Sequence, residues 1–158
     1  MKCILSFLAV CVLALLCGGC FLQFDDVSDE PQYAAVLNSN YVLKTNMLVQ
    51  GINMDSGYGS KIHFYSLKPF SQRVVGPEII TNITFYSGQT VEVAGIRRSS
   101  TAPLFEKKLV QAVLHSSLEL QAGCPLVAEL KYILETNYFE KLNKKQNAPT
   151  NSVDRANL

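Results

Sequence analysis

The stretch that decides the predicted fold is Ile79-Ile-Thr-Asn-Ile-Thr-Phe-Tyr-Ser-Gly-Gln-Thr-Val-Glu-Val-Ala-Gly-Ile96. Its two ends, 79–86 and 90–96, are rich in β-branched residues, which favour strands. The three residues between them include Gly88, and glycine is common in tight turns. The pattern therefore predicts a hairpin of two antiparallel strands joined across Ser87–Gln89.

Two more strands are predicted upstream of this hairpin. Apolar and polar residues alternate from Tyr41 to Val49, and a second short strand is expected over Ile62–Leu67, ended by Pro69. The segment between them, Gly51–Ser60, contains three glycines and is interpreted as a loop. Together with the hairpin, these strands predict an antiparallel four-stranded meander.

Downstream, the apolar spacing changes to that of helices. A stripe with helical spacing predicts a helix from Pro103 to Leu120, although a strand over Leu109–Leu120 remains an alternative, since residues 115–118 could interrupt a helix. A second helix is expected from Pro125 to Leu142, because proline suits a first helical position. The predicted fold class is α+β: the meander followed by two C-terminal helices packed on one face.

The N-terminus has the organisation of an export signal. Lys2 precedes a 13-residue apolar stretch, Ile4–Leu16, and small residues follow. A membrane-spanning helix needs about 20 apolar residues, so the stretch is too short to be one. The expected organisation is a signal peptide at 1–19, an acidic tether at 20–40, a single domain at 41–142 and a disordered polar tail at 143–158.

The residues Leu15-Leu-Cys-Gly-Gly-Cys20 resemble the lipobox of bacterial lipoproteins. Gly18, Gly19 and Cys20 fit that motif, while Cys17 stands where the family usually has an aliphatic residue. The resemblance implies that Cys20 is lipidated on its sulfur and becomes the mature N-terminus. Because Phe21 is not the aspartate that signals inner-membrane retention in that family, the resemblance implies the outer membrane, with the domain facing the periplasm or the cell surface.

A secreted protein without a lipid anchor is the alternative. Cleavage near Gly19 by a general signal peptidase would then leave Cys20 and Cys124 as thiols in an oxidising compartment, where they could form a disulfide bond. Lipidation of Cys20 would leave Cys124 without that partner.

The charge balance excludes some function classes. The full chain has 158 residues, of which 17% are charged, and a net charge of +1. Removal of residues 1–19 takes away one basic residue, Lys2, and leaves 139 residues with 13 basic and 13 acidic side chains. A neutral product is neither a strongly basic nucleic-acid binder nor an acidic disordered protein.

Residues suited to catalysis are few. The chain has two histidines, His63 and His115, and neither has metal-ligand spacing around it. Phosphate-binding and dinucleotide-binding motifs are also missing from the sequence. We therefore expect no enzyme, no metal and no cofactor. A thiol hydrolase would have to use Cys124 with one of the two histidines as its base.

Two groups of residues are candidates for binding. The glycine-rich loop carries Asn53, Asp55 and Tyr58, and exposed loops on a rigid sheet are common recognition sites. Arg97 and Arg98 could form a basic patch for an acidic partner. The expected function is a non-enzymatic assembly or accessory subunit of the cell envelope, bound to the membrane by lipid and to an envelope protein, with no nucleic acid. The alternative is a carrier of a small apolar ligand or lipid.

Overall fold

The computed structural model describes residues 23–55, 57, 59–100 and 109–142. Its elements in chain order are β1 (Phe24–Asp26), the 3-10 helix η1 (Pro31–Tyr33), β2 (Asn40–Leu43), β3 (Met47–Ile52), β4 (Phe64–Lys68), the 3-10 helix η2 (Phe70–Gln72), β5 (Ile79–Phe85), β6 (Thr90–Ser99), β7 (Val110–Ser116), β8 (Leu126–Glu129), the α-helix α2 (Leu130–Leu134) and β9 (Phe139–Lys141). None of the helices in this part of the chain has the length and apolar character needed to cross a membrane.

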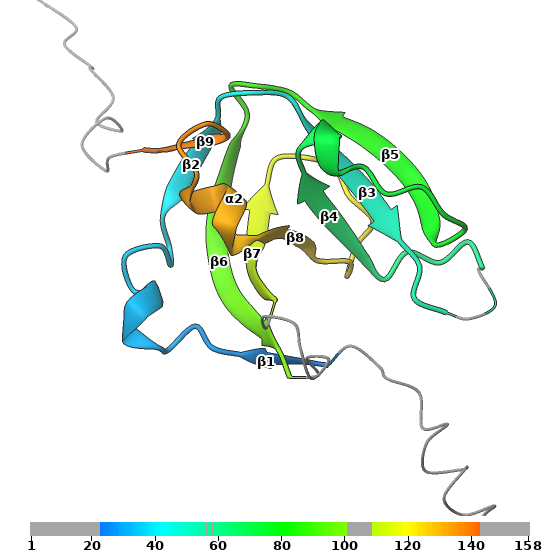
Figure 1. The fold of residues 1–158 in the computed structure, drawn as a ribbon, viewed down its shortest axis with the longest axis horizontal. Coiled ribbons are helices and arrows are strands. Elements are labelled where there is room, and N and C mark those ends of the chain that lie inside the picture. The colour runs from blue at the N-terminus through cyan, green and yellow to red at the C-terminus, as the bar shows by residue number, and fades with distance from the viewer. Residues whose placement is uncertain (1–22, 56, 58, 101–108, 143–158) are drawn as a thin grey trace, which may run out of the picture.

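The nine strands of the described residues form one mixed sheet (Figure 1). Their order is β5-β3-β4-β8-β7-β6-β2-β9, and β1 pairs with β6. The β4–β8 pair is parallel, and the other pairs are antiparallel. The predicted four-stranded meander with two C-terminal helices is therefore wrong.

One antiparallel ladder runs through β2 and β3 on one side and through β6 and β5 on the other. Asn40 lies opposite Glu92, and Met47, seven residues further along, lies opposite Phe85, seven residues further back. The register is therefore the same in both halves. The pairing continues across the bend between the two halves of the ladder, where Gly88 N donates to the Leu43 carbonyl oxygen over 2.8 Å.

The predicted hairpin between residues 79–86 and 90–96 is wrong, because these two strands each pair with other strands. β5 and β6 do not pair with each other, since β5 pairs with β3 and β6 pairs with β1, β2 and β7. Residues 86–89 form a bend between two strands, at which Gly88 takes a φ of +86°. Glycine adopts this conformation without the steric penalty of a Cβ atom, and it does so equally at a hairpin turn and at a bend.

The sheet is rolled up. Four strands, β4, β8, β7 and β6, stand between β3 and β2 in the sheet, yet residues 44–46 alone connect β2 to β3 in the chain. Such a link spans about 14 Å at most. The sheet must therefore curve until β2 returns to the end of β3, as Figure 1 shows.

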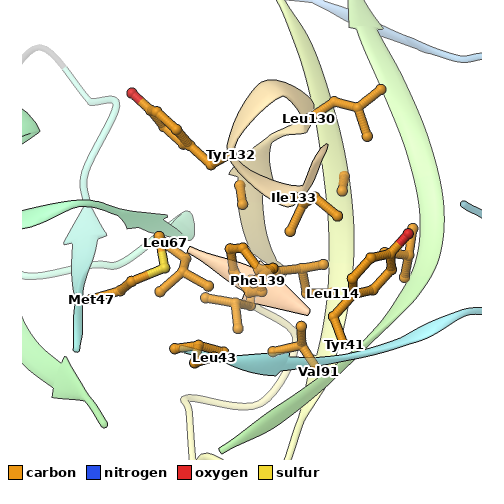
Figure 2. Packing of buried hydrophobic residues seen from close by; sticks show 14 of the residues in the cluster. Tyr41, Leu43, Met47, Leu67, Val91, Leu114, Leu130, Tyr132, Ile133 and Phe139 are labelled. Carbon is orange, nitrogen blue, oxygen red and sulfur yellow. The ribbon is translucent and has the colours of Figure 1, made fainter. Parts of the chain in front are cut away.

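The core fills the inside of this rolled sheet. Alternate strand residues are almost fully buried there, among them Leu43, Met47, Leu67, Phe85, Val91 and Leu114. Figure 2 shows that Ile133 of α2 and Phe139 of β9 lie in the same cluster as Leu114 and Tyr41. Burial of an apolar side chain of this size contributes about 1.5–3 kcal/mol. The short helix and the last strand thus complete the core.

Neither predicted helix has the extent that the sequence suggested, because both segments contain strands. The segment from Pro103 to Leu120 contains β7, so its strand alternative is the one that the structure shows; residues 101–108 lie outside the described residues. The segment from Pro125 to Leu142 contains β8, α2 and β9. Three consecutive residues of β8, Leu126–Ala128, are buried. A strand buried on both faces shows no alternation, and a short apolar run of this kind can equally indicate a helix.

The acidic segment lies on the sheet from Gln23 onward. β1 pairs with the end of β6, so that Asp25 and Asp26 lie opposite Arg98 and Arg97. Further along, Tyr33 and Val36 join the core cluster. Residues 23–40, expected as a tether, therefore belong to the folded unit. The expected signal peptide, Cys20 and the expected tail at 143–158 lie outside the described residues.

Candidate functional site

The glycine-rich loop is tied down at its base by Asn53. This side chain is only 2% exposed; its Nδ2 donates to the Gly59 carbonyl oxygen, and its Oδ1 accepts a hydrogen bond from Asp55 N over 2.6 Å. Asn53 is thus occupied in holding the loop and is not presented to a partner.

Asp55 is an exposed residue of the same loop. Its Oδ1 lies 3.5 Å from His63 Nε2, and its side chain is 59% exposed. His63 Nδ1 accepts a hydrogen bond from Met54 N over 3.1 Å, which fixes the ring at the edge of the loop. Tyr58, the third candidate of this loop, lies outside the described residues.

Arg97 is held between aromatic rings. Its guanidinium carbon lies 4.3 Å from the centre of the Phe24 ring and 5.8 Å from that of Phe64. Its Nε donates to Gln111 Oε1 over 2.9 Å. Burial lowers the pKa of Arg97, and the side chain serves mainly to fasten β1 to the sheet.

Arg98 is engaged by the N-terminal segment. Its two terminal nitrogens donate to Glu30 over 2.9 and 2.5 Å, and one of them also donates to the Tyr33 hydroxyl over 3.2 Å. The same hydrogen bonds raise the pKa of Arg98, and the bond from Arg98 lowers that of Glu30. Adjacent residues of a strand point to opposite faces, so Arg97 and Arg98 do not form one basic patch.

A groove of about 440 Å³ lies where β7 ends and the chain leads on to β8. The residues that line it are mostly apolar: Val113, Leu114, His115, Ser116, Leu118, Leu120, Gly123, Cys124, Pro125 and Leu126. Gly123 takes a φ of +80°, which turns the chain toward β8. His115 is exposed at the rim and also borders a smaller hollow of about 220 Å³ beside Glu92.

The wall of the groove is attached to β4 and to the segment just before it. Cys124 Sγ donates to the Ile62 carbonyl oxygen over 3.0 Å, and Gln121 N donates to the Tyr65 hydroxyl over 3.4 Å. These bonds hold the segment 117–125 in place. Within the described residues Cys124 forms no disulfide bond.

Sequence reasoning missed the groove as a unit. His115, Cys124 and the Gly123–Pro125 turn are each visible in the sequence, but the helix predicted over 103–120 separates them. The structure brings them together because Leu114 of β7 lies directly opposite Leu126 of β8. That pairing depends on the whole sheet and leaves no local signal.

The described residues contain neither a metal-ligand cluster nor an unpaired buried polar atom that would indicate a second binding site. In the described part of the chain, no group of three or more histidine, cysteine or acidic side chains could hold a metal ion. In the same part, every buried side-chain nitrogen or oxygen has a hydrogen-bond partner. The groove also offers more room for a ligand, at about 440 Å³, than the hollow of about 220 Å³ beside Glu92.

Three comparisons were made with known proteins. No protein-family model, no curated protein and no solved structure matches this chain.

Proposed function

We propose that this protein is a lipid-anchored, non-enzymatic accessory subunit of the outer membrane, which binds an apolar segment of an envelope protein in the groove between β7 and β8. The groove is the observation that carries this proposal. Its volume of about 440 Å³ lies within the range of about 300–1,000 Å³ usual for ligand sites.

The apolar and polar composition of the groove lining favours a protein as the binding partner. An apolar floor with a polar rim is the usual composition of a protein interface. Leu118, Leu120 and Pro125 provide apolar surface, and His115 provides a polar group at the rim. The bonds of Cys124 to Ile62 and of Gln121 to Tyr65 hold this surface in shape, which reduces the entropy lost on binding.

Lipid attachment is supported by the resemblance of Leu15–Cys20 to the lipobox. Gln23, three residues after Cys20 in the sequence, is attached to the sheet, because its carbonyl oxygen accepts hydrogen bonds from Ser100. A domain attached so closely would remain at the membrane surface, where an accessory subunit meets its partner.

A carrier of a small apolar ligand is the second candidate, because the same volume would also accept such a molecule. The two candidates differ in what occupies the groove: an apolar segment of a protein in one case, and a small molecule that can be extracted in the other.

The test combines mass measurement with photo-crosslinking. Intact mass of the mature protein should show acylation of Cys20. A photoreactive phenylalanine analogue placed at Leu118 or Leu120 should form an adduct with one protein in intact cells. Leu134, which is 57% exposed and does not line the groove, provides the matched control position.

The outcomes separate the candidates. An adduct from both groove positions that is lost in a Pro125→Arg background, and none from Leu134, supports protein binding. A small apolar molecule that co-purifies with the protein and protects Cys124 from alkylation would instead support the carrier. An unacylated terminus with a Cys20–Cys124 disulfide would overturn the lipoprotein assignment.

A further inference from the structure

The N-terminus of the folded unit is fixed to one end of the sheet. Ser100 N and Ser100 Oγ both donate to the Gln23 carbonyl oxygen, over 2.9 and 2.8 Å. The next residue, Phe24, lies opposite Ser99, the last residue of β6. We call this end of the sheet, formed by Gln23, Ser99, Ser100 and Leu109, the β1 end.

The chain between Cys20 and the β1 end is very short. Phe21 and Leu22 alone stand between Cys20 and Gln23. Three residue steps span about 10 Å when fully extended. A tether of 20 residues would let the domain rotate freely above a membrane, whereas a link of this length determines which side of the domain faces it.

The four residues of the β1 end are uncharged. Next to them, Asp25 and Asp26 of β1 lie opposite Arg98 and Arg97 in the strand register, while the side chains of these arginines bind Glu30 and Gln111. The β1 end therefore brings no acidic side chain of its own to an anionic lipid surface.

The groove lies toward the other end of β7. Val110, at the start of β7, pairs with Arg98 near the β1 end, whereas Ser116, six residues later, pairs with Val91. At about 3.3 Å per residue, the groove residues 113–116 stand roughly 10–20 Å further from the β1 end. Figure 1 shows β1 on one side of the molecule and the connection from β7 to β8 extending away from it.

We infer that the β1 end rests on the lipid headgroups and that the groove opens away from the membrane. The inference rests on the proposed lipidation of Cys20 and adds to it an orientation: Gln23 is at the lipid surface, and the end of β7 faces the aqueous side. A partner would then reach the groove without entering the bilayer.

The test measures the distance of two positions from the lipid surface. The lipidated full-length protein, in a Cys124→Ser background, receives one new cysteine at either Gln23 or Ser117, both of which are exposed. Each variant is labelled with the same fluorophore and reconstituted in phosphatidylethanolamine–phosphatidylglycerol vesicles that contain a headgroup spin label. Circular dichroism establishes that both variants are folded.

We expect the label at position 23 to lose most of its fluorescence and the label at position 117 to lose little. Insertion of a 20-residue Gly/Ser linker after Phe21 should remove this difference. Similar quenching at both positions, or stronger quenching at 117, in protein whose mass shows acylation would overturn the orientation alone. Absence of acylation would overturn the proposed function on which it rests.

Discussion

The side-chain amide of Gln50 binds both backbone groups of Val74, 24 residues further along the chain. Val74 N donates to Gln50 Oε1 over 3.1 Å, and Gln50 Nε2 donates to the Val74 carbonyl oxygen over 2.9 Å. Gln50 is fully buried and also donates to Asn82 Oδ1 over 2.9 Å. It thereby fastens the connection between η2 and β5 to the sheet.

Replacement of Gln50 by leucine should destabilise the fold. The substitution leaves the polar atoms of Val74 and Asn82 without this partner, at a cost of about 2–3 kcal/mol. Urea unfolding followed by circular dichroism measures the change. Gln72→Leu, at an exposed side chain at the end of η2, should change the free energy of unfolding by less than about 0.5 kcal/mol. Equal effects of the two substitutions would contradict the role of Gln50.

Gly88→Ala should destabilise the bend between β5 and β6. The φ of +86° is unfavourable for any residue with a Cβ atom, at about 1–2 kcal/mol. The added Cβ would contact nothing within 4 Å, so the whole effect comes from the backbone. Gly57→Ala is the matched control, because its Cβ would also meet nothing within 4 Å and its φ is not positive. If both variants unfold at the same urea concentration, the bend does not require glycine.

Glu30→Gln should change the acid sensitivity of the protein. Arg98 lowers the pKa of Glu30 below its ordinary value of 4.5 in the folded state. The resulting stabilisation is fully present above the ordinary pKa and is lost as the pH falls through the lowered folded value. The wild type should therefore exceed Glu30→Gln in stability at pH 7, and the difference should shrink below pH 4.5.

The control for this prediction is Asp29→Asn, which makes the same change of charge at an exposed neighbouring residue. Its stability should follow the wild-type pH profile. A pH-independent difference between wild type and Glu30→Gln would show that ionisation of Glu30 does not contribute.

Arg97→Lys should lower stability by about 1 kcal/mol, because lysine replaces a planar guanidinium that lies over Phe24 and donates through Nε to Gln111. Arg73→Lys, at an exposed side chain, should have no measurable effect on thermal unfolding. Unchanged stability of Arg97→Lys would return Arg97 to the group of candidate binding residues.

The sequence predicted strands well where one face is exposed. Alternation predicted a strand over 41–49, where β2 and β3 lie, and a short strand was predicted over 62–67, close to β4. β-Branched residues predicted strands at 79–86 and 90–96, close to β5 and β6. These patterns missed β8, which is buried on both faces, and β1, a three-residue edge strand containing Asp25 and Asp26. The pairing of the strands was not predictable, because Gly88 has the same local signal at a bend as at a hairpin turn.

For the candidate binding residues, the sequence showed their types but not the residues that they contact in the fold. Arg97 and Arg98 were identified by type, but their side chains bind Gln111 and Glu30, which lie 14 and 68 residues away along the chain. The groove depends on the pairing of Leu114 with Leu126. Local sequence patterns carry no information about such distant partners.

The last strand also determines when the protein can finish folding. β9 pairs with β2, so that Lys141 meets Tyr41 one hundred residues earlier, and Phe139 enters the core. Contacts between residues so far apart in the chain require closure of a long loop, which makes folding slow. Synthesis must therefore reach the C-terminal part of the chain before the core can close, and until then the apolar inner face of the sheet is open to association with other chains.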